Sequence, residues 1–154
     1  MTGSAQRSAP QTPLAVAVRV ALVLVAVAPF VPPLSAGVPG LEGIGWLLDQ
    51  WFAYQCHRDP GRSLHLLGTV LPVCMRCLGI YLGLGFGALV LRPRLSVVAL
   101  RVWVGAAAAL MVADVVAYWA GLYGGWAVAR LVTGLALSYP VGIALVQAAR
   151  GERV

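Results

Sequence analysis

The stretch "LAVAVRVALVLVAVAPFVPPL", residues 14–34, decides the fold class of this chain. Apart from Arg19 it holds no charged side chain, and about 20 helical residues cross a hydrocarbon layer of about 30 Å. The guanidinium of Arg19 lies near one end, where it can extend to the interface. The stretch therefore predicts a membrane span. A cleaved signal peptide with "VALVLVAVA" as its apolar core is the alternative, although no convincing cleavage site follows it.

The composition agrees with a membrane protein. The 154 residues are 60% hydrophobic and 10% charged, and the mean hydropathy is +0.87, which is outside the range of soluble domains. The net charge is +6, and all eleven basic residues are arginines scattered singly along the chain. Because they form no basic face, nucleic acid is not an expected partner. The lipid bilayer is the expected partner, and the sequence identifies no protein partner.

Three further spans are predicted beyond the first. They are "VLPVCMRCLGIYLGLGFGALVL" (70–91), residues 95–121 and residues 126–149. Residues 35–55 have apolar residues at helical spacing, interrupted by acidic ones, which indicates an interfacial or re-entrant helix. The predicted fold is thus an all-α integral membrane protein with four transmembrane helices and one interfacial helix. Residues 14–149 form the single domain, between a disordered tail at 1–13 and a short tail at 150–154.

The arginines predict the orientation of the four spans. One side of the membrane has many of them and the other has only Arg58 and Arg62 in its loops. The richer side has Arg7, Arg92, Arg94, Arg150 and Arg153, with Arg19 and Arg101 close by. The positive-inside rule then places both termini in the cytoplasm of a multi-pass protein of the cell (inner) membrane. The loop after residue 55 faces outward, and it would do so even if the first span were a removed signal peptide.

All three cysteines and both histidines of the chain lie between residues 56 and 77. Cys74 and Cys77 are three positions apart, so in a helix they share one face. The helix N-terminus and Arg76 favour a thiolate there. Cys56 and His57 end the interfacial segment. The loop after them must return to the membrane depth at which Cys74 and Cys77 begin the second predicted span. These four residues form a Cys3His set, which matches the ligands that zinc prefers, and copper(I) would accept them as well.

Two charged residues lie inside the last two spans. Asp114 and Arg130 are ten and six residues from Gly124 in the connecting turn, so both lie about 9–15 Å below that turn. A charge alone in lipid is costly, and we therefore expect the two to pair across the helical hairpin. The pair has either a structural or a functional role.

Gly79, Gly83 and Gly87 recur every fourth residue on the second predicted span. Small residues at this spacing let another helix approach closely, so we expect a packing face there. Tyr81 lies about one turn beyond Cys77 and either belongs to the packed core or reaches the cysteines.

The motifs "CHRDPGRS" and "LPVCMRCLGIYLG" resemble the signature of a family of small predicted bacterial and archaeal membrane proteins classed as a domain of unknown function. The resemblance covers roughly residues 50–140. The matching residues are Cys56, His57, Arg62, Ser63, Cys74, Arg76, Cys77, Gly79, Tyr81, Asp114, Arg130, Thr133 and Gly134. Many members have a glycine after the aspartate and a glutamine soon afterwards, where this chain reads "DVVAYW". The resemblance supports the choice of residues and implies no activity.

Three chemistries stay open for the cysteines. The first is a metal site of Cys56, His57, Cys74 and Cys77, either structural and closed or catalytic and open, with Arg62, Arg76, Tyr81, Asp114 and Arg130 as supporting residues. The second is thiol–disulfide exchange with a quinone as cofactor, because a C-x-x-C at the outer end of a membrane helix is similar to quinone-linked thiol oxidases and vitamin K epoxide reductases. The third is an inert membrane scaffold. His65 is assigned to none of them.

Overall fold

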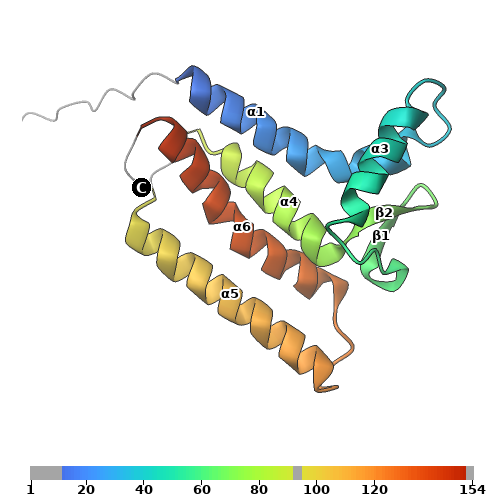
Figure 1. Cartoon of the computed structure of the whole chain (residues 1–154). Coiled ribbons are helices and arrows are strands. Elements are labelled where there is room, and N and C mark those ends of the chain that lie inside the picture. Colours follow the sequence, from blue (N-terminus) through green and yellow to red (C-terminus); the bar gives the residue numbers. More distant parts are fainter. Residues whose placement is uncertain (1–11, 92–94, 152–154) are drawn as a thin grey trace, which may run out of the picture.

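The computed structural model describes residues 12–91 and 95–151. Four main helices lie roughly alongside one another, and a small cap covers one end of the bundle (Figure 1). The elements are α1 (Pro13–Val27), η1 (Ala28–Phe30), α2 (Val31–Ser35), α3 (Glu42–Ala53), η2 (Pro60–Arg62), β1 (Ser63–Leu66), β2 (Thr69–Cys74), α4 (Met75–Ala88), α5 (Val97–Trp119) and α6 (Ala127–Ala149). Most of the predicted tails, together with Arg7, Arg92, Arg94 and Arg153, lies outside the described residues.

Three of the predicted spans are confirmed as long apolar helices. Within the described chain, Pro13–Ser35, α5 and α6 have 23 residues each and are apolar enough to cross a membrane. At 1.5 Å per residue such a helix is about 34 Å long, which exceeds the hydrocarbon thickness of about 30 Å. The helix predicted within residues 35–55 is present as α3, and its place at the membrane interface stays a prediction.

The prediction of a helical span at 70–91 is wrong for its first residues. Residues Thr69–Cys74 form strand β2, which pairs with β1 in a two-stranded antiparallel sheet. Only α4 remains helical, with 14 residues, or about 21 Å, so a fourth full-length span is not established and the fold is not purely α-helical. Pro72 favours an extended conformation at the residue before it. The positive φ of Leu67 (52°) and Gly68 (79°) makes the tight turn between the strands.

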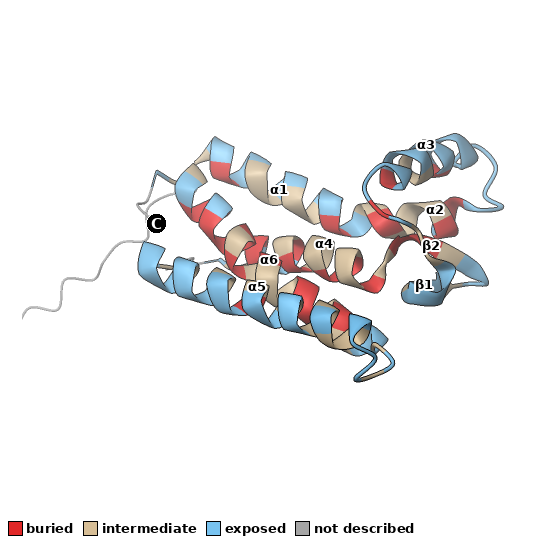
Figure 2. Cartoon of the chain, turned by 60° about the horizontal axis from the view of Figure 1, so that its bottom comes forward, coloured by how far each residue is buried: buried red, intermediate tan, exposed pale blue. Residues whose placement is uncertain are grey.

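The packing face predicted from the glycines of α4 is confirmed. A Cβ atom on Gly79 would lie 3.0 Å from the backbone nitrogen of Leu135, and one on Gly87 would lie 2.9 Å from that of Ile143. The contact at Gly87 is shorter than real Cβ atoms show and the contact at Gly79 is at that limit, so glycine is what lets the backbones of α4 and α6 approach each other. These two helices are the buried centre of the bundle, whereas α5 is exposed along most of its length (Figure 2).

Both described ends of the chain lie at the same end of the bundle. The Thr12 hydroxyl donates to the carbonyl oxygen of Ala149 at 2.8 Å, and Arg19 donates to the carbonyl oxygen of Val90 beyond the C-terminus of α4 at 3.1 Å. The cap of α3, β1 and β2 lies at the opposite end (Figure 1). This arrangement puts the start of α4 beside the cap.

Candidate functional site

The three cysteines meet where the cap joins α4. Their Sγ atoms all lie within 4.8 Å of one another, although Cys56 follows α3 whereas Cys74 and Cys77 belong to the β2–α4 junction. Cys74 is the N-cap of α4, and its backbone N–H donates to the Sγ atom of Cys56 at 3.2 Å. The predicted convergence of these thiols is therefore present, and we call this group the thiol cluster.

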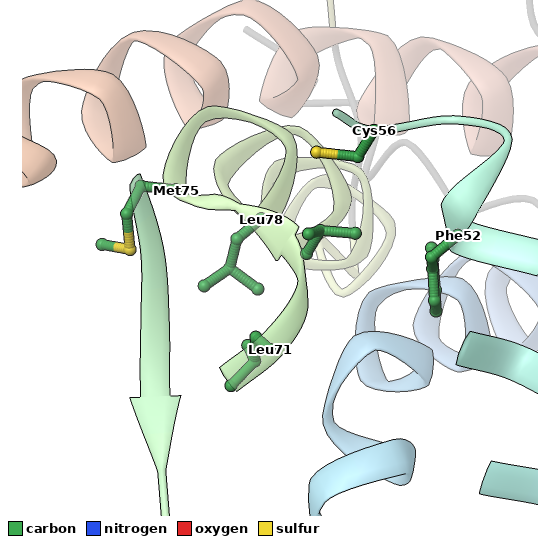
Figure 3. Packing of buried hydrophobic residues seen from close by; sticks show 6 residues of the cluster. Phe52, Cys56, Leu71, Met75 and Leu78 are labelled. Atoms are coloured by element: carbon green, nitrogen blue, oxygen red, sulfur yellow. The ribbon is translucent and has the colours of Figure 1, made fainter. Parts of the chain in front are cut away.

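A small hydrophobic core holds the thiol cluster in place. Figure 3 shows Phe52 and Cys56 beside Leu71, Met75 and Leu78, all of which are buried. Phe52 anchors the end of α3, and its carbonyl oxygen accepts a hydrogen bond from the backbone N–H of Cys56 at 3.0 Å. Burying the apolar residues of α3 and β2 against α4 thus brings Cys56 to the other thiols.

The surroundings of Cys74 favour its ionised form. Hydrogen bonding with the Cys77 side chain lowers the pKa of the Cys74 thiol to about 5, although partial burial acts in the opposite direction. The Cys56 side chain and the backbone groups of Arg76 and Cys77 contribute to the same lowering of the pKa. A thiolate is the form of cysteine that binds metals and attacks disulfides.

The structure does not bring His57 into the thiol cluster. Its side chain is exposed, and the cluster of metal-ligating groups found in the described residues consists of the three cysteines. The next residue, Arg58, has a positive φ of 51° and forms an ion pair with Asp49 of α3. The chain therefore turns away directly after Cys56. His65 is also exposed, on β1.

Tyr81 packs beside the thiol cluster rather than into it. Its ring contacts Phe52 edge to face with a centroid distance of 5.5 Å, and its hydroxyl donates to the side-chain oxygen of Gln55. Tyr81 and Phe52 also line an apolar cavity of about 250 Å3. The other lining residues are Leu24, Val25, Ala28, Leu48 and Trp51. No sequence pattern distinguished Phe52 or Gln55 as site residues.

The ion pair predicted between Asp114 and Arg130 is wrong. Asp114 of α5 pairs with Arg76 of α4 instead. The guanidinium carbon of Arg130 lies 4.9 Å from the centroid of the Tyr118 ring, and that of Arg62 lies 5.0 Å from the same ring. Arg62 also donates to the Tyr118 hydroxyl at 3.0 Å. Tyr118 is thus a site residue that sequence reasoning missed, since an aromatic residue near a helix end is typical of any membrane helix.

Comparison with known proteins points to one family. The family model described as "Predicted membrane protein (DUF2085)" matches residues 56–144, a range that contains every predicted site residue. An uncharacterized protein of Methanothermobacter thermautotrophicus is 56% identical over 32 residues, which are 21% of this chain and 29% of that relative. The chain therefore matches less than a third of the length of this relative. No solved structure matches the chain.

Proposed function

The chain belongs to the DUF2085 family of predicted membrane proteins, and we propose that it is a membrane metalloprotein whose Cys56, Cys74 and Cys77 bind one transition-metal ion. Zinc is the first choice of metal and copper(I) the second, because both accept thiolate ligands.

The observation behind this proposal is the convergence of three sulfur atoms within 4.8 Å of one another. With zinc–sulfur bonds of about 2.3 Å, ligand sulfurs around a tetrahedral ion are about 3.8 Å apart. Small side-chain rotations would close the remaining difference. Cys74 is the N-cap of α4, Cys77 lies in its first turn and Cys56 follows α3. A bound ion would therefore also fasten the cap to the bundle.

Three protein ligands leave one position of a four-coordinate zinc ion open. Sites of this kind hold water or a substrate in the fourth position, whereas structural zinc sites have four protein ligands. His57 would become a fourth ligand only if the chain after Cys56 changed its path. We therefore favour an accessible site with an exchangeable fourth ligand over a closed structural one.

The proposed site faces the non-cytoplasmic side of the cell (inner) membrane. Both termini would be cytoplasmic because the arginines Arg19 and Arg150 lie at the end of the bundle where Thr12 contacts Ala149, in agreement with the positive-inside rule. The thiol cluster belongs to the opposite end, beside the cap.

Metal analysis of the purified protein tests the proposal. Protein prepared in detergent under anaerobic, reducing conditions should contain about one zinc or copper ion per chain. Cys74→Ser and Cys56→Ser should contain clearly less than one metal ion per chain, and His65→Ala serves as the matched control because this exposed histidine lies outside the thiol cluster. Wild-type protein without stoichiometric metal would contradict the proposal and leave the redox function or an inert scaffold.

The cavity beside Tyr81 favours thiol–disulfide oxidation linked to a quinone as the second function. An apolar space of about 250 Å3 lies beside the packed residues Phe52 and Tyr81, where the ring of a quinone would be close to the thiols. Oxidation of the Cys74 and Cys77 thiols to a disulfide would transfer two electrons and two protons to the quinone, giving the quinol. A quinone analogue that is reduced only when Cys74 and Cys77 are present, with equal oxidation of the dithiol, would support this function.

A further inference from the structure

A second group of polar side chains lies apart from the thiol cluster. A small cavity of about 30 Å3 lies between η2, α4, α5 and α6. It is lined by Arg62, Arg76, Val115, Tyr118, Trp119 and Arg130, and we call it the arginine pocket. Its three arginines come from three different elements, so the fold, rather than local sequence, brings their positive charges together.

The arginine pocket has more positive than negative charge. The Nε atom of Arg62 lies 2.9 Å from a carboxylate oxygen of Asp59, and Arg76 forms an ion pair with Asp114. Among residues 12–91 and 95–151, no carboxylate lies within ion-pair distance of Arg130. The contact found for its guanidinium in this part of the chain is the Tyr118 ring.

Arg130 is also the most deeply buried of the three arginines, with 8% of its surface exposed. A buried charge without a counter-ion is costly in a membrane protein, and such residues normally face a cavity or a partner of opposite charge. The side chain of Arg130 lines the arginine pocket, so an anion there would supply the missing negative charge.

We propose that the arginine pocket binds a phosphate group. A guanidinium offers parallel N–H donors that match two oxygens of a phosphate, and arginines from several elements can contact the several oxygens of a tetrahedral anion. A cavity of about 30 Å3 has room for only two or three water molecules, each of which needs at least about 10–15 Å3. It therefore has room for two or three oxygens of a phosphate group among the arginines, and for no sugar or aromatic ring.

The aromatic residues at this end of the bundle suggest where the phosphate comes from. Trp119 and Trp126 flank the α5–α6 loop and are highly exposed, as expected for side chains at the level of lipid head groups. A phospholipid head group would present its phosphate at this level. Soluble phosphate on the same side of the membrane has the same chemistry, so the experiment must separate the two sources.

Lipid retention and phosphate titration together test the proposal. The full chain is reconstituted in nanodiscs with phosphatidylglycerol and with a phosphate-free galactolipid, and native mass spectrometry measures the lipid that the released protein retains. Calorimetry in a lipid-free detergent measures the affinity for inorganic phosphate. Arg62→Gln removes an exposed pocket arginine and should weaken binding about tenfold, the effect of losing one charge-assisted hydrogen bond.

Two further variants make the result specific. Arg58→Gln is the matched control, because Arg58 lies in the same loop but pairs with Asp49 outside the pocket. Arg130→Lys loses the planar pair of N–H donors, so it should weaken phosphate binding. It keeps the positive charge, so no neutral side chain replaces the buried arginine. Cys74→Ser should bind phosphate as the wild type does, which keeps this result separate from that of the metal proposal.

Each outcome supports or overturns the phosphate site. Selective retention of phosphatidylglycerol that Arg62→Gln weakens supports a lipid head group. Calorimetric binding of inorganic phosphate without lipid selectivity supports soluble phosphate. Wild-type protein that retains both lipids equally and gives no binding heat with phosphate overturns the proposal. So does binding that Arg62→Gln and Arg58→Gln affect equally.

Discussion

The backbone N–H of Cys74 donates to the Sγ atom of Cys56 at 3.2 Å, across a separation of 18 residues. This hydrogen bond joins the end of α3 to the start of α4 and directs the Cys56 sulfur towards Cys77. It is a contact that brings the thiols of the proposed metal site together from two segments of the chain.

The three cysteines and His57 should differ in their effect on metal affinity. Cys56→Ser removes a sulfur ligand and should weaken zinc binding by about 100-fold or more. His57→Ala should change it by less than about threefold, since this exposed side chain is not part of the thiol cluster. Competition titration with a chromophoric chelator measures both affinities. An equal loss with His57→Ala would mean that the histidine moves to the metal.

Asp114 should be energetically coupled to Arg76 and not to Arg130. Asp114→Asn leaves Arg76 without its counter-ion, which should lower the free energy of unfolding by roughly 2 kcal/mol. In double-mutant cycles with Arg76→Gln the coupling should exceed about 1 kcal/mol, whereas the cycle with Arg130→Gln should give less than about 0.5 kcal/mol. Reversible unfolding in mixed micelles provides the values. A larger coupling to Arg130 would restore the pair expected from the sequence.

The contact between α4 and α6 should not tolerate a methyl group at its glycines. A Cβ atom on Gly83 would lie 2.6 Å from the carbonyl oxygen of Leu135, so Gly83→Ala should destabilise the bundle by about 1–3 kcal/mol. Gly105 of α5 is the control, because a Cβ there meets nothing within 4 Å. Gly105→Ala should be neutral or stabilising by up to about 1 kcal/mol. Equal thermal stability of the two variants in detergent would show that the helices are not in close contact.

The two ends of the bundle should label from opposite sides of the membrane. In a variant without native cysteines, Leu67→Cys at the exposed hairpin turn should react with an impermeant maleimide in intact cells. Gly151→Cys, which lies beyond the end of α6, should react only after permeabilisation. The reverse pattern would put the thiol cluster in the cytoplasm.

Long apolar stretches made most of the fold predictable. Residues 14–34, 95–121 and 126–149 are each apolar over more than 20 residues with at most two charged side chains, so helices of membrane length were expected from the sequence. The hairpin was not predictable in the same way. "VLPVC" is apolar throughout and merges with the helix after it, and Leu67–Gly68 lacks the Asn-Gly or Asp-Gly pair that usually identifies a two-residue hairpin turn.

The three thiols of the candidate site were predictable, but the exclusion of His57 and the contacts of the charged residues were not. Spacing and chemistry identified the thiols, because soft ligands within 22 residues of an apolar chain have few other roles. Helical pitch gave the depths of Asp114 and Arg130 along their helices but not the direction in which either side chain leaves its helix. The partner of Asp114 and the position of Tyr118 between two arginines depend on how α4, α5 and α6 pack, which no local pattern specifies.

X-ray absorption at the metal edge tests the central claim most directly, since it counts the sulfur ligands of the ion in the purified protein. The proposed metal site predicts three sulfur atoms at about 2.3 Å and one lighter ligand for zinc, with one sulfur fewer in Cys56→Ser. A first shell made only of oxygen and nitrogen, or a sulfur count that Cys56→Ser leaves unchanged, would contradict a metal site built from these three cysteines.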